Sequence, residues 1–176
     1  MHKLKVEELG RKSVEEFRQS EKLPVTVILD NVRSMHNVGS VFRTADAFLL
    51  NGVCLCGYTP RPPHRDIQKT ALGATESVDW SYYETTEEAV RHLREQGYRI
   101  WAVEQASGST ALQAFAPGPG EKTAVVFGNE VEGVTPSVLA HCDGVLEIPQ
   151  WGTKHSLNVS VAAGIVLWEI RKSFIA

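Results

Sequence analysis

The stretch Val25-Thr-Val-Ile-Leu29 is a continuous run of apolar, mostly β-branched residues. A run of this kind is typical of a strand that is buried on both faces of a parallel sheet. Outward from it, strand-like and helix-like segments alternate to the end of the chain. This alternation predicts an α/β domain whose largely parallel sheet is covered by helices on both faces. Further strands are expected at 53–56, 77–83, 99–103, 123–127 and 144–148, and helices at 38–50, 66–72, 85–97, 136–141 and 159–170.

Both ends of the chain are expected to be helical. Residues 3–20 are rich in charge with a loose apolar stripe, and the proline in Lys22-Leu-Pro24 ends that segment. We therefore expect a helical N-terminal extension over 1–23, followed by one domain over 24–176. The last helix has the clearest pattern, with apolar residues at i, i+3 and i+4 spacing at Val159, Ala162, Ala163, Val166, Leu167 and Ile170.

Composition narrows the classes of function. The 176 residues are 43% hydrophobic and 22% charged, as in a soluble globular protein. The formal net charge is −3, so a function in RNA binding requires a local basic patch. The three cysteines do not form a disulfide scaffold, and Cys54 and Cys56 are expected on one face of a strand rather than in a metal site. Neither an apolar leader nor a stretch of membrane-spanning length is seen, which indicates a cytoplasmic protein.

Polar residues gather in three segments that follow predicted strands. Ligands of open parallel sheets bind beyond the carboxyl ends of the strands, so these segments mark the candidate site. The first segment runs from Asp30 to Arg43 and holds two asparagines, two arginines and a histidine. Asn37 and Arg43 are about 240° apart around a helix, so they converge only if Asn37 lies in its first turn. Val38-Gly39-Ser40 would then open the helix, with free N–H groups facing a phosphate.

The other two segments follow later strands. In Gly128-Asn-Glu-Val-Glu-Gly133 the bracketing glycines indicate a backbone in close approach to another group, and Glu130 could anchor a ligand or turn toward a cation. In the third segment, 149–158, either Ser156 or Asn158 is expected to cap the last helix. The absence of a G-x-G-x-x-G fingerprint and of a G-x-S-x-G elbow argues against a dinucleotide-binding protein and a serine hydrolase.

The three segments resemble the three sequence motifs of SpoU-class (TrmH-like) RNA ribose methyltransferases, within the SPOUT superfamily. The resemblance spans residues 24–172 and implies a C-terminal deep trefoil knot, S-adenosylmethionine bound within that knot, and a homodimer. The dimer would form through the knot region and the final helix, where Trp168 and Phe174 would suit an interface. The matching stretches are Asn37-Val-Gly-Ser-Val-Phe-Arg-Thr-Ala-Asp-Ala47, Val126-Phe-Gly-Asn-Glu-Val-Glu-Gly-Val134 and Ile148-Pro-Gln-Trp-Gly-Thr-Lys-His-Ser-Leu-Asn-Val-Ser-Val-Ala-Ala163.

The resemblance also implies roles for individual residues. Arg43 matches the proposed catalytic arginine, and Asn37 matches the asparagine that shapes the site. Glu130 matches the acid of the second motif, and Ser156 and Asn158 match the pair in the third. Contacts to the cofactor are implied at Val103, Glu104, Gly128, Asn129, Ile148, Ser156 and Leu157. Contacts to RNA are expected at the basic residues Arg33, Arg43, Arg61, Arg65, Lys69 and Lys154.

The implied activity is transfer of a methyl group from S-adenosylmethionine to a ribose 2′-hydroxyl of RNA. tRNA is favoured over rRNA, because family members without an added RNA-binding domain typically modify tRNA. The pKa of an arginine is ordinarily above about 12, so Arg43 is expected to bind the adjacent phosphate and orient the hydroxyl rather than act as a base. His36 and His155 are weaker candidates for the base. Two other functions remain open, namely a non-catalytic RNA-binding protein that retains the fold and a nucleotide-binding enzyme acting on a small molecule.

Overall fold

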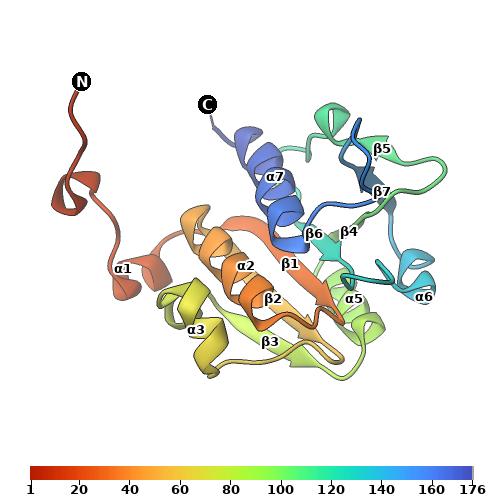
Figure 1. Ribbon diagram of the computed structural model, residues 1–176, viewed down its shortest axis with the longest axis horizontal. Coiled ribbons are helices and arrows are strands. Elements are labelled where there is room, and N and C mark those ends of the chain that lie inside the picture. The colour runs from red at the N-terminus through yellow and green to blue at the C-terminus, as the bar shows by residue number, and fades with distance from the viewer. Residues whose placement is uncertain (176) are drawn as a thin grey trace.

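The computed structural model describes residues 1–175, apart from the side chain of Val6, and its centre is a seven-stranded sheet (Figure 1). The strand order is β3-β2-β1-β6-β4-β7-β5, and all neighbouring strands are parallel. The strands are β1 (Leu23–Asp30), β2 (Leu50–Cys56), β3 (Trp80–Tyr83), β4 (Arg99–Val103), β5 (Thr110–Ala111), β6 (Thr123–Phe127) and β7 (Gly144–Glu147).

Strand β1 lies near the middle of the sheet, between β2 and β6. Val25, Val27, Ile28 and Leu29 are fully buried, since both faces of the sheet are covered at this strand. The apolar run that opened the sequence analysis is therefore confirmed as a strand with two buried faces.

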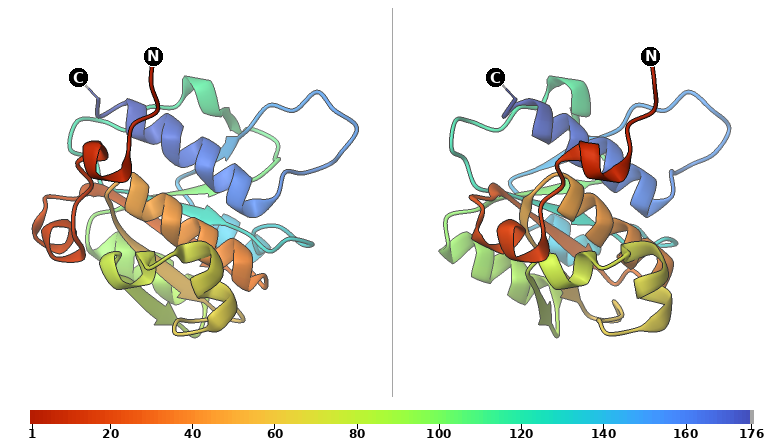
Figure 2. Two further views of the ribbon diagram at one scale, coloured as in Figure 1. Left: turned by 60° about the vertical axis from the view of Figure 1, so that its left-hand side comes forward. Right: turned by 90° about the vertical axis from the view of Figure 1, so that its left-hand side faces the viewer.

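Helices cover the two faces of the sheet unequally. One face packs against α2 (Met35–Ala47), α3 (Arg65–Ala71), α4 (Ala74–Ser77), α7 (Val159–Lys172) and the 3₁₀ turn η2 (Leu112–Ala114). The other packs against α5 (Thr86–Glu95) and α6 (Pro136–Leu139). Helices α2 and α7 are in contact and lie side by side over the first face (Figure 2). The predicted α/β class, the parallel sheet and the two helical layers are confirmed.

The N-terminal segment differs from the single helix predicted over 3–20. It forms a 3₁₀ turn, η1 (Val6–Leu9), and a separate helix, α1 (Val14–Gln19). The break has a local cause: Gly10 takes a left-handed conformation (φ 59°), and Ser13 then caps a new helix by accepting a hydrogen bond from the Glu16 N–H. Phe17 of α1 is buried in the core, and the Arg18 guanidinium donates to the carbonyl of Glu76 in α4.

The predicted strand over 77–83 is too long at its beginning. Ser77 belongs to α4, where its hydroxyl donates to the carboxylate of Asp46, and only the last four residues of that range form β3. The two-residue strand β5 and the turn η2 were not predicted, because elements this short carry no hydrophobic period in the sequence.

The cysteines of β2 occupy the predicted position. Cys54 and Cys56 are both buried against the layer that contains α5, and burial raises the pKa of the Cys54 thiol to about 12. Within residues 1–175, no cluster of His, Cys, Asp and Glu has the arrangement of a metal site, and no helix is long and apolar enough to cross a membrane. The trefoil knot depends on how residues 148–158 thread from β7 to α7, and it stays a prediction.

Candidate functional site

The beginning of α2 places the first predicted site residue. Ser34 caps the helix, and its hydroxyl accepts from the main-chain N–H of Asn37, so Asn37 lies in the first turn as the sequence analysis required. The helix does not open at 38–40, however. The Val38 N–H already donates to the Ser34 carbonyl at 3.0 Å, so the predicted phosphate-binding N–H groups at 38–40 are wrong.

Gly39 has a packing role rather than a ligand-binding one. A Cβ atom at Gly39 would lie 2.1 Å from the Thr70 hydroxyl and 2.2 Å from the Ile67 carbonyl oxygen. The residue therefore allows α2 and α3 to pack closely, which holds the first turn of α2 in place.

A hydrogen-bonded chain of three side chains joins the three motifs. Glu130 accepts from the Asn37 side-chain amide at 3.2 Å, and the Asn37 carbonyl oxygen accepts from the Asn158 amide, also at 3.2 Å. The side-chain oxygen of Asn158 caps α7 by accepting from the N–H groups of Ser160 and Val161. The prediction that Asn158 or Ser156 caps the last helix is thus confirmed for Asn158.

Glu130 is held as a carboxylate by the segment before α2. Its two oxygens accept from the main-chain N–H groups of Arg33 and Ser34, each at 3.1 Å, in addition to Asn37. Partial burial raises the pKa of Glu130, but these hydrogen bonds outweigh burial, and the net pKa lies below the ordinary glutamate value. The acid of the second motif therefore fixes the first motif in space.

The turn Gly128–Gly133 owes its shape to its glycines and to Asn129. The main chains of Asn129 and Gly133 exchange two hydrogen bonds at 2.9 Å, and the Asn129 side-chain oxygen accepts from the N–H groups of Val131 and Glu132. A Cβ atom at Gly128 would lie 2.1 Å from the Gly133 carbonyl carbon. The close approach inferred from the glycines is confirmed, and the approaching group is the turn itself.

A cavity of about 550 Å³ opens beside this turn, beyond the carboxyl ends of β4, β6 and β7. This size suits a small-molecule ligand. The lining residues include the apolar Phe127, Ile148 and Ala162, and polar and charged residues of the motif loops line the rest of the cavity. All seven residues implied to contact the cofactor line this cavity, namely Val103, Glu104, Gly128, Asn129, Ile148, Ser156 and Leu157.

Arg43 lies elsewhere. It lines a second hollow of about 440 Å³ between α2, α3 and α7, together with Ser40, Lys69, Thr70 and Gly164. Asn37, Glu130 and Asn158 are brought together, but within one subunit Arg43 does not line the cavity that Glu130 and Asn158 line.

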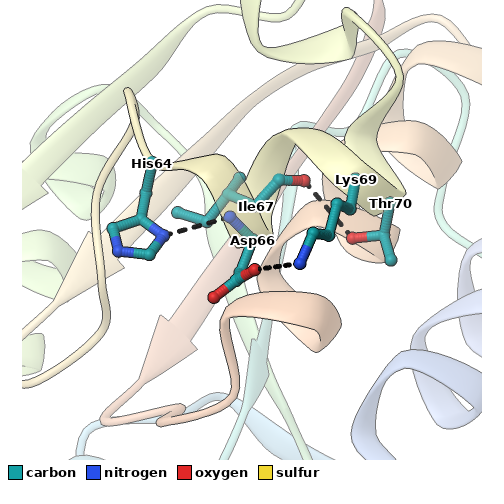
Figure 3. Close-up of polar contacts among 5 residues, drawn as sticks. All are labelled: His64, Asp66, Ile67, Lys69 and Thr70. Atoms are coloured by element: carbon teal, nitrogen blue, oxygen red, sulfur yellow. Dashed lines mark hydrogen bonds and ion pairs between the residues drawn. The ribbon is translucent and has the colours of Figure 1, made fainter.

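The remaining predicted contacts to RNA are exposed basic side chains. Arg33 precedes α2, Arg65 begins α3, and Lys154 lies in the exposed loop before α7. The Arg61 guanidinium lies 4.1 Å from the centre of the Tyr82 ring. The Lys69 ammonium is paired with Asp66 at 2.6 Å (Figure 3). Both candidate bases, His36 and His155, are exposed.

Sequence reasoning missed two residues that shape the site. Ser34 accepts from the N–H of Asn37. Asn31 connects the end of β1 to two neighbouring loops, because its side-chain oxygen accepts from the Tyr58 N–H and its main-chain carbonyl accepts from the Asn129 side-chain amide. Ser34 carries a recognisable signal, because a serine directly before a helical pattern is a common N-cap. Asn31 carries the weaker signal of an asparagine at a strand end, and asparagine tolerates the left-handed φ of 55° found there.

Comparisons with known proteins agree with this geometry. The sequence profile described as the SpoU rRNA methylase family matches residues 24–168. The chain belongs to this family. It is 34% identical over 149 residues to the 23S rRNA (guanosine-2′-O-)-methyltransferase RlmB of Neisseria meningitidis, covering 85% of this chain and 58% of that protein. It is 33% identical over 168 residues to the tRNA (guanosine(18)-2′-O)-methyltransferase of Thermus thermophilus, covering 94% of this chain and 83% of that protein.

Solved structures of this family share the fold. An AdoMet-bound rRNA methyltransferase from Sinorhizobium meliloti has a TM-score of 0.81 at 27% identity, covering 94% of this chain and 62% of that one. The TrmH/SpoU tRNA-modifying enzyme of A. aeolicus has a TM-score of 0.79 at 24% identity, covering 91% and 81%. The present SpoU chain spans less than two thirds of the length of several RlmB relatives, including those of N. meningitidis and Vibrio parahaemolyticus.

Proposed function

We propose that this SpoU-family protein transfers a methyl group from S-adenosylmethionine to a ribose 2′-hydroxyl of RNA. The observation that carries the proposal is the hydrogen-bonded chain Glu130–Asn37–Asn158, which joins the three family motifs at the cavity. A family fold with scattered motifs would support only a shared architecture. Motifs tied together at one cavity support a shared reaction.

The cavity suits S-adenosylmethionine in size and in chemistry. Its volume of about 550 Å³ is that of a small-molecule site, and both apolar and polar residues line it. We assign the cofactor contacts to Val103, Glu104, Gly128, Asn129, Ile148, Ser156 and Leu157. The cofactor supplies an activated methyl group when it is bound, so the protein needs only to position the ribose and handle its proton.

Arg43 is proposed to bind the RNA phosphate next to the target ribose and so to orient the 2′-hydroxyl. A guanidinium remains charged near neutral pH and presents paired N–H donors that match a phosphate, which suits positioning better than proton abstraction. Arg43 is exposed, and Lys69 lines the same hollow. Asn37, Glu130 and Asn158 maintain the shape of the site, and exposed Ser156 lies at the cavity wall, where its hydroxyl can contact cofactor or ribose.

We further propose that the protein forms a homodimer through α7 and the adjoining motif loop. Helix α7 buries one apolar face against α2 and exposes a second apolar stripe at Val161, Ile165 and Trp168. Gly164, between these residues, lines the hollow that contains Arg43. A second subunit packed on this stripe would lie beside Arg43, which one subunit alone keeps apart from its own cavity.

The RNA is proposed to be tRNA rather than rRNA, and the site of action the cytoplasm. The T. thermophilus tRNA enzyme is covered over 83% of its length, whereas the N. meningitidis rRNA enzyme is covered over 58%. The match with the tRNA enzyme therefore extends over a larger share of that protein. The exposed residues Arg33, Arg61, Arg65 and Lys154 are proposed to contact the RNA together with Arg43.

The test is a transfer assay with labelled S-adenosylmethionine and total RNA, followed by digestion to nucleosides and mass spectrometry. A labelled 2′-O-methyl nucleoside is expected, and the labelled RNA species identifies the substrate. Absence of both methyl transfer and cofactor binding would instead support a non-catalytic RNA-binding protein that retains the fold.

A further inference from the structure

A loop at the carboxyl end of β2 presents an exposed aromatic ring. The loop reads Gly57-Tyr-Thr-Pro-Arg-Pro-Pro-His-Arg65. The side chain of Tyr58 is 82% exposed, whereas its neighbour Thr59 is 2% exposed. An aromatic ring that stays exposed beside a buried residue suggests a binding role, because covering such a ring lowers the free energy.

The main chain that carries Tyr58 is fixed at several points. The Tyr58 N–H donates to the Asn31 side-chain oxygen at 3.0 Å. The Thr59 hydroxyl donates to the Leu29 carbonyl and accepts from the Val32 N–H, both at 3.1 Å. At the far end of the loop, the His64 ring nitrogen accepts from the Asp66 N–H and caps α3 (Figure 3). The exposed ring therefore stands on an ordered support.

This support is continuous with the candidate site. The carbonyl of Asn31 accepts from the Asn129 side-chain amide at 2.8 Å, and the N–H of Arg33, two residues further, donates to Glu130. The loop after β2 and the turn of the second motif thus both form hydrogen bonds with residues 31–33. Tyr58 and the cavity turn are therefore positioned by the same segment, residues 31–33.

The same part of the chain is basic. Residues 31–72 contain five Lys and Arg against two Asp and Glu, whereas residues 73–176 contain seven against thirteen. Within residues 1–175, the side chains of Arg33, Arg61 and Arg65 form no ion pair. Arg61 is held against Tyr82, whose hydroxyl also donates to the Gly57 carbonyl. Residues 31–72 therefore supply the local positive charge that a protein of net charge −3 needs in order to bind RNA.

We infer that Tyr58 is a stacking platform for an unpaired RNA base that neighbours the target ribose, while Arg61 and Arg65 bind the flanking phosphates. Single-stranded RNA is recognised by aromatic rings that stack on splayed bases within basic surroundings, and a paired base would keep its faces hidden in the helix. The inference rests on the proposed function and narrows its substrate class to loops and single strands.

The test uses fluorescence anisotropy with two labelled ten-nucleotide probes, an oligoadenylate and an abasic ribose-phosphate strand. Tyr58→Ala is expected to weaken oligoadenylate binding by about 5- to 100-fold and to leave abasic binding unchanged. Tyr58→Phe, which keeps the ring, is expected to bind both probes as the natural protein does. A natural protein that binds the two probes equally, or a Tyr58→Ala variant that keeps oligoadenylate affinity, would overturn the inference.

The proposed phosphate contact of Arg61 can be tested against a control residue, Lys122. Arg61→Ala is expected to weaken both probes alike and to lower the slope of log affinity against log salt by about 0.7, one phosphate contact. Lys122 is also an exposed cation near a tyrosine ring, 5.7 Å from the centre of Tyr98, but it lies at the amino end of β6. Lys122→Ala is expected to leave both affinities and the slope unchanged, and an equal effect of the two variants would remove the case for Arg61.

Failure of the inference is distinguishable from failure of the proposed function. The total-RNA transfer assay is repeated with Tyr58→Ala. If the natural protein transfers methyl groups and Tyr58→Ala has an unchanged KM for RNA, the proposed methyltransferase activity stands and the stacking role is overturned. Oligoadenylate binding that depends on Tyr58, without any methyl transfer or cofactor binding, would retain the stacking role and overturn the methyltransferase.

Discussion

The two hollows of this molecule are built differently. The charged residues that line the cavity beyond β4, β6 and β7 include the acids Glu104, Glu130 and Glu132. The charged residues that line the hollow between α2, α3 and α7 are the cations Arg43 and Lys69. A cofactor with a positive sulfonium suits acidic surroundings, and a phosphate suits basic ones. This difference in charge supports our proposal that one subunit binds cofactor in the first hollow and positions RNA at the second.

The largest effect is expected from a methyl group added at Gly128, in the turn that lines the cavity beyond β4, β6 and β7. In Gly128→Ala, the new Cβ would lie 2.1–2.3 Å from main-chain atoms of Gly133 and Val134, so the turn must move. We expect S-adenosylmethionine affinity to fall by about 10- to 100-fold, as for other overpacked sites that cost 1–3 kcal/mol. Isothermal titration calorimetry measures this directly.

The second hollow provides the control for that variant. Gly164 lines it, and a Cβ atom there would have no neighbour within 4 Å. Gly164→Ala is therefore expected to keep cofactor affinity and to gain up to about 1 kcal/mol of helix stability. If the two alanine variants lost cofactor affinity equally, the contrast between the hollows would not hold.

Removal of the cation should separate turnover from cofactor binding. Arg43→Ala is expected to reduce kcat/KM for RNA by about 100-fold through lost positioning while the Kd for S-adenosylmethionine stays unchanged. Arg43→Lys should lose most of the turnover as well, because an ammonium cannot replace a bidentate guanidinium. Arg91, an exposed arginine on the opposite helical layer, is the control residue, and Arg91→Ala should behave as the natural protein does. A loss of cofactor affinity in Arg43→Ala would show that the hollows act as one site.

Most of the fold was predictable from the sequence, because the strands of the sheet and the helices that pack on it have clear hydrophobic patterns. Strands β4 and β6 have the predicted bounds, and the buried face of α7 contains five of the six residues named for it. The start of α2 was placed three residues late, because Ser34 rather than Asn37 caps that helix. The apolar stripe over 3–20 is interrupted at Gly10, which marks the place of the division, but the sequence did not reveal that the left-handed conformation of Gly10 separates two elements there.

The candidate site was predictable in membership but not in arrangement. The motif spacing placed Asn37, Glu130 and Asn158 together, and the structure connects them by hydrogen bonds. Arg43 shares its motif with Asn37, yet helical geometry carries it to a different hollow. The supporting contacts of Asn31 join three separate segments of chain, and a pattern along one sequence does not encode such long-range contacts.

The anchoring of Glu130 predicts a pH-dependent contribution to stability. Its folded-state pKa is below the ordinary value, so the stabilisation is present above the ordinary pKa of about 4.3 and is lost as pH falls through the lower folded-state pKa. Glu130→Gln should lower the melting temperature at pH 7, since an amide offers one acceptor where three donors meet. The difference in melting temperature between the two proteins should shrink below about pH 4. A difference that is constant with pH would mean that the carboxylate charge contributes nothing.

The smallest expected effect concerns dimer formation, which would place the cavity of one subunit beside the Arg43 hollow of the other. Ile165 on the exposed stripe of α7 is 39% exposed, and Val14 at the start of α1 is 41% exposed, so both are half-covered apolar residues on helices. Ile165→Glu is expected to weaken the dimer by about tenfold, because a charge would be buried at the interface. Val14→Glu should leave it intact, and sedimentation equilibrium measures both. If the natural protein is a dimer that Ile165→Glu does not weaken, the partner does not cover α7, and Arg43 must then reach the RNA without help from a second subunit.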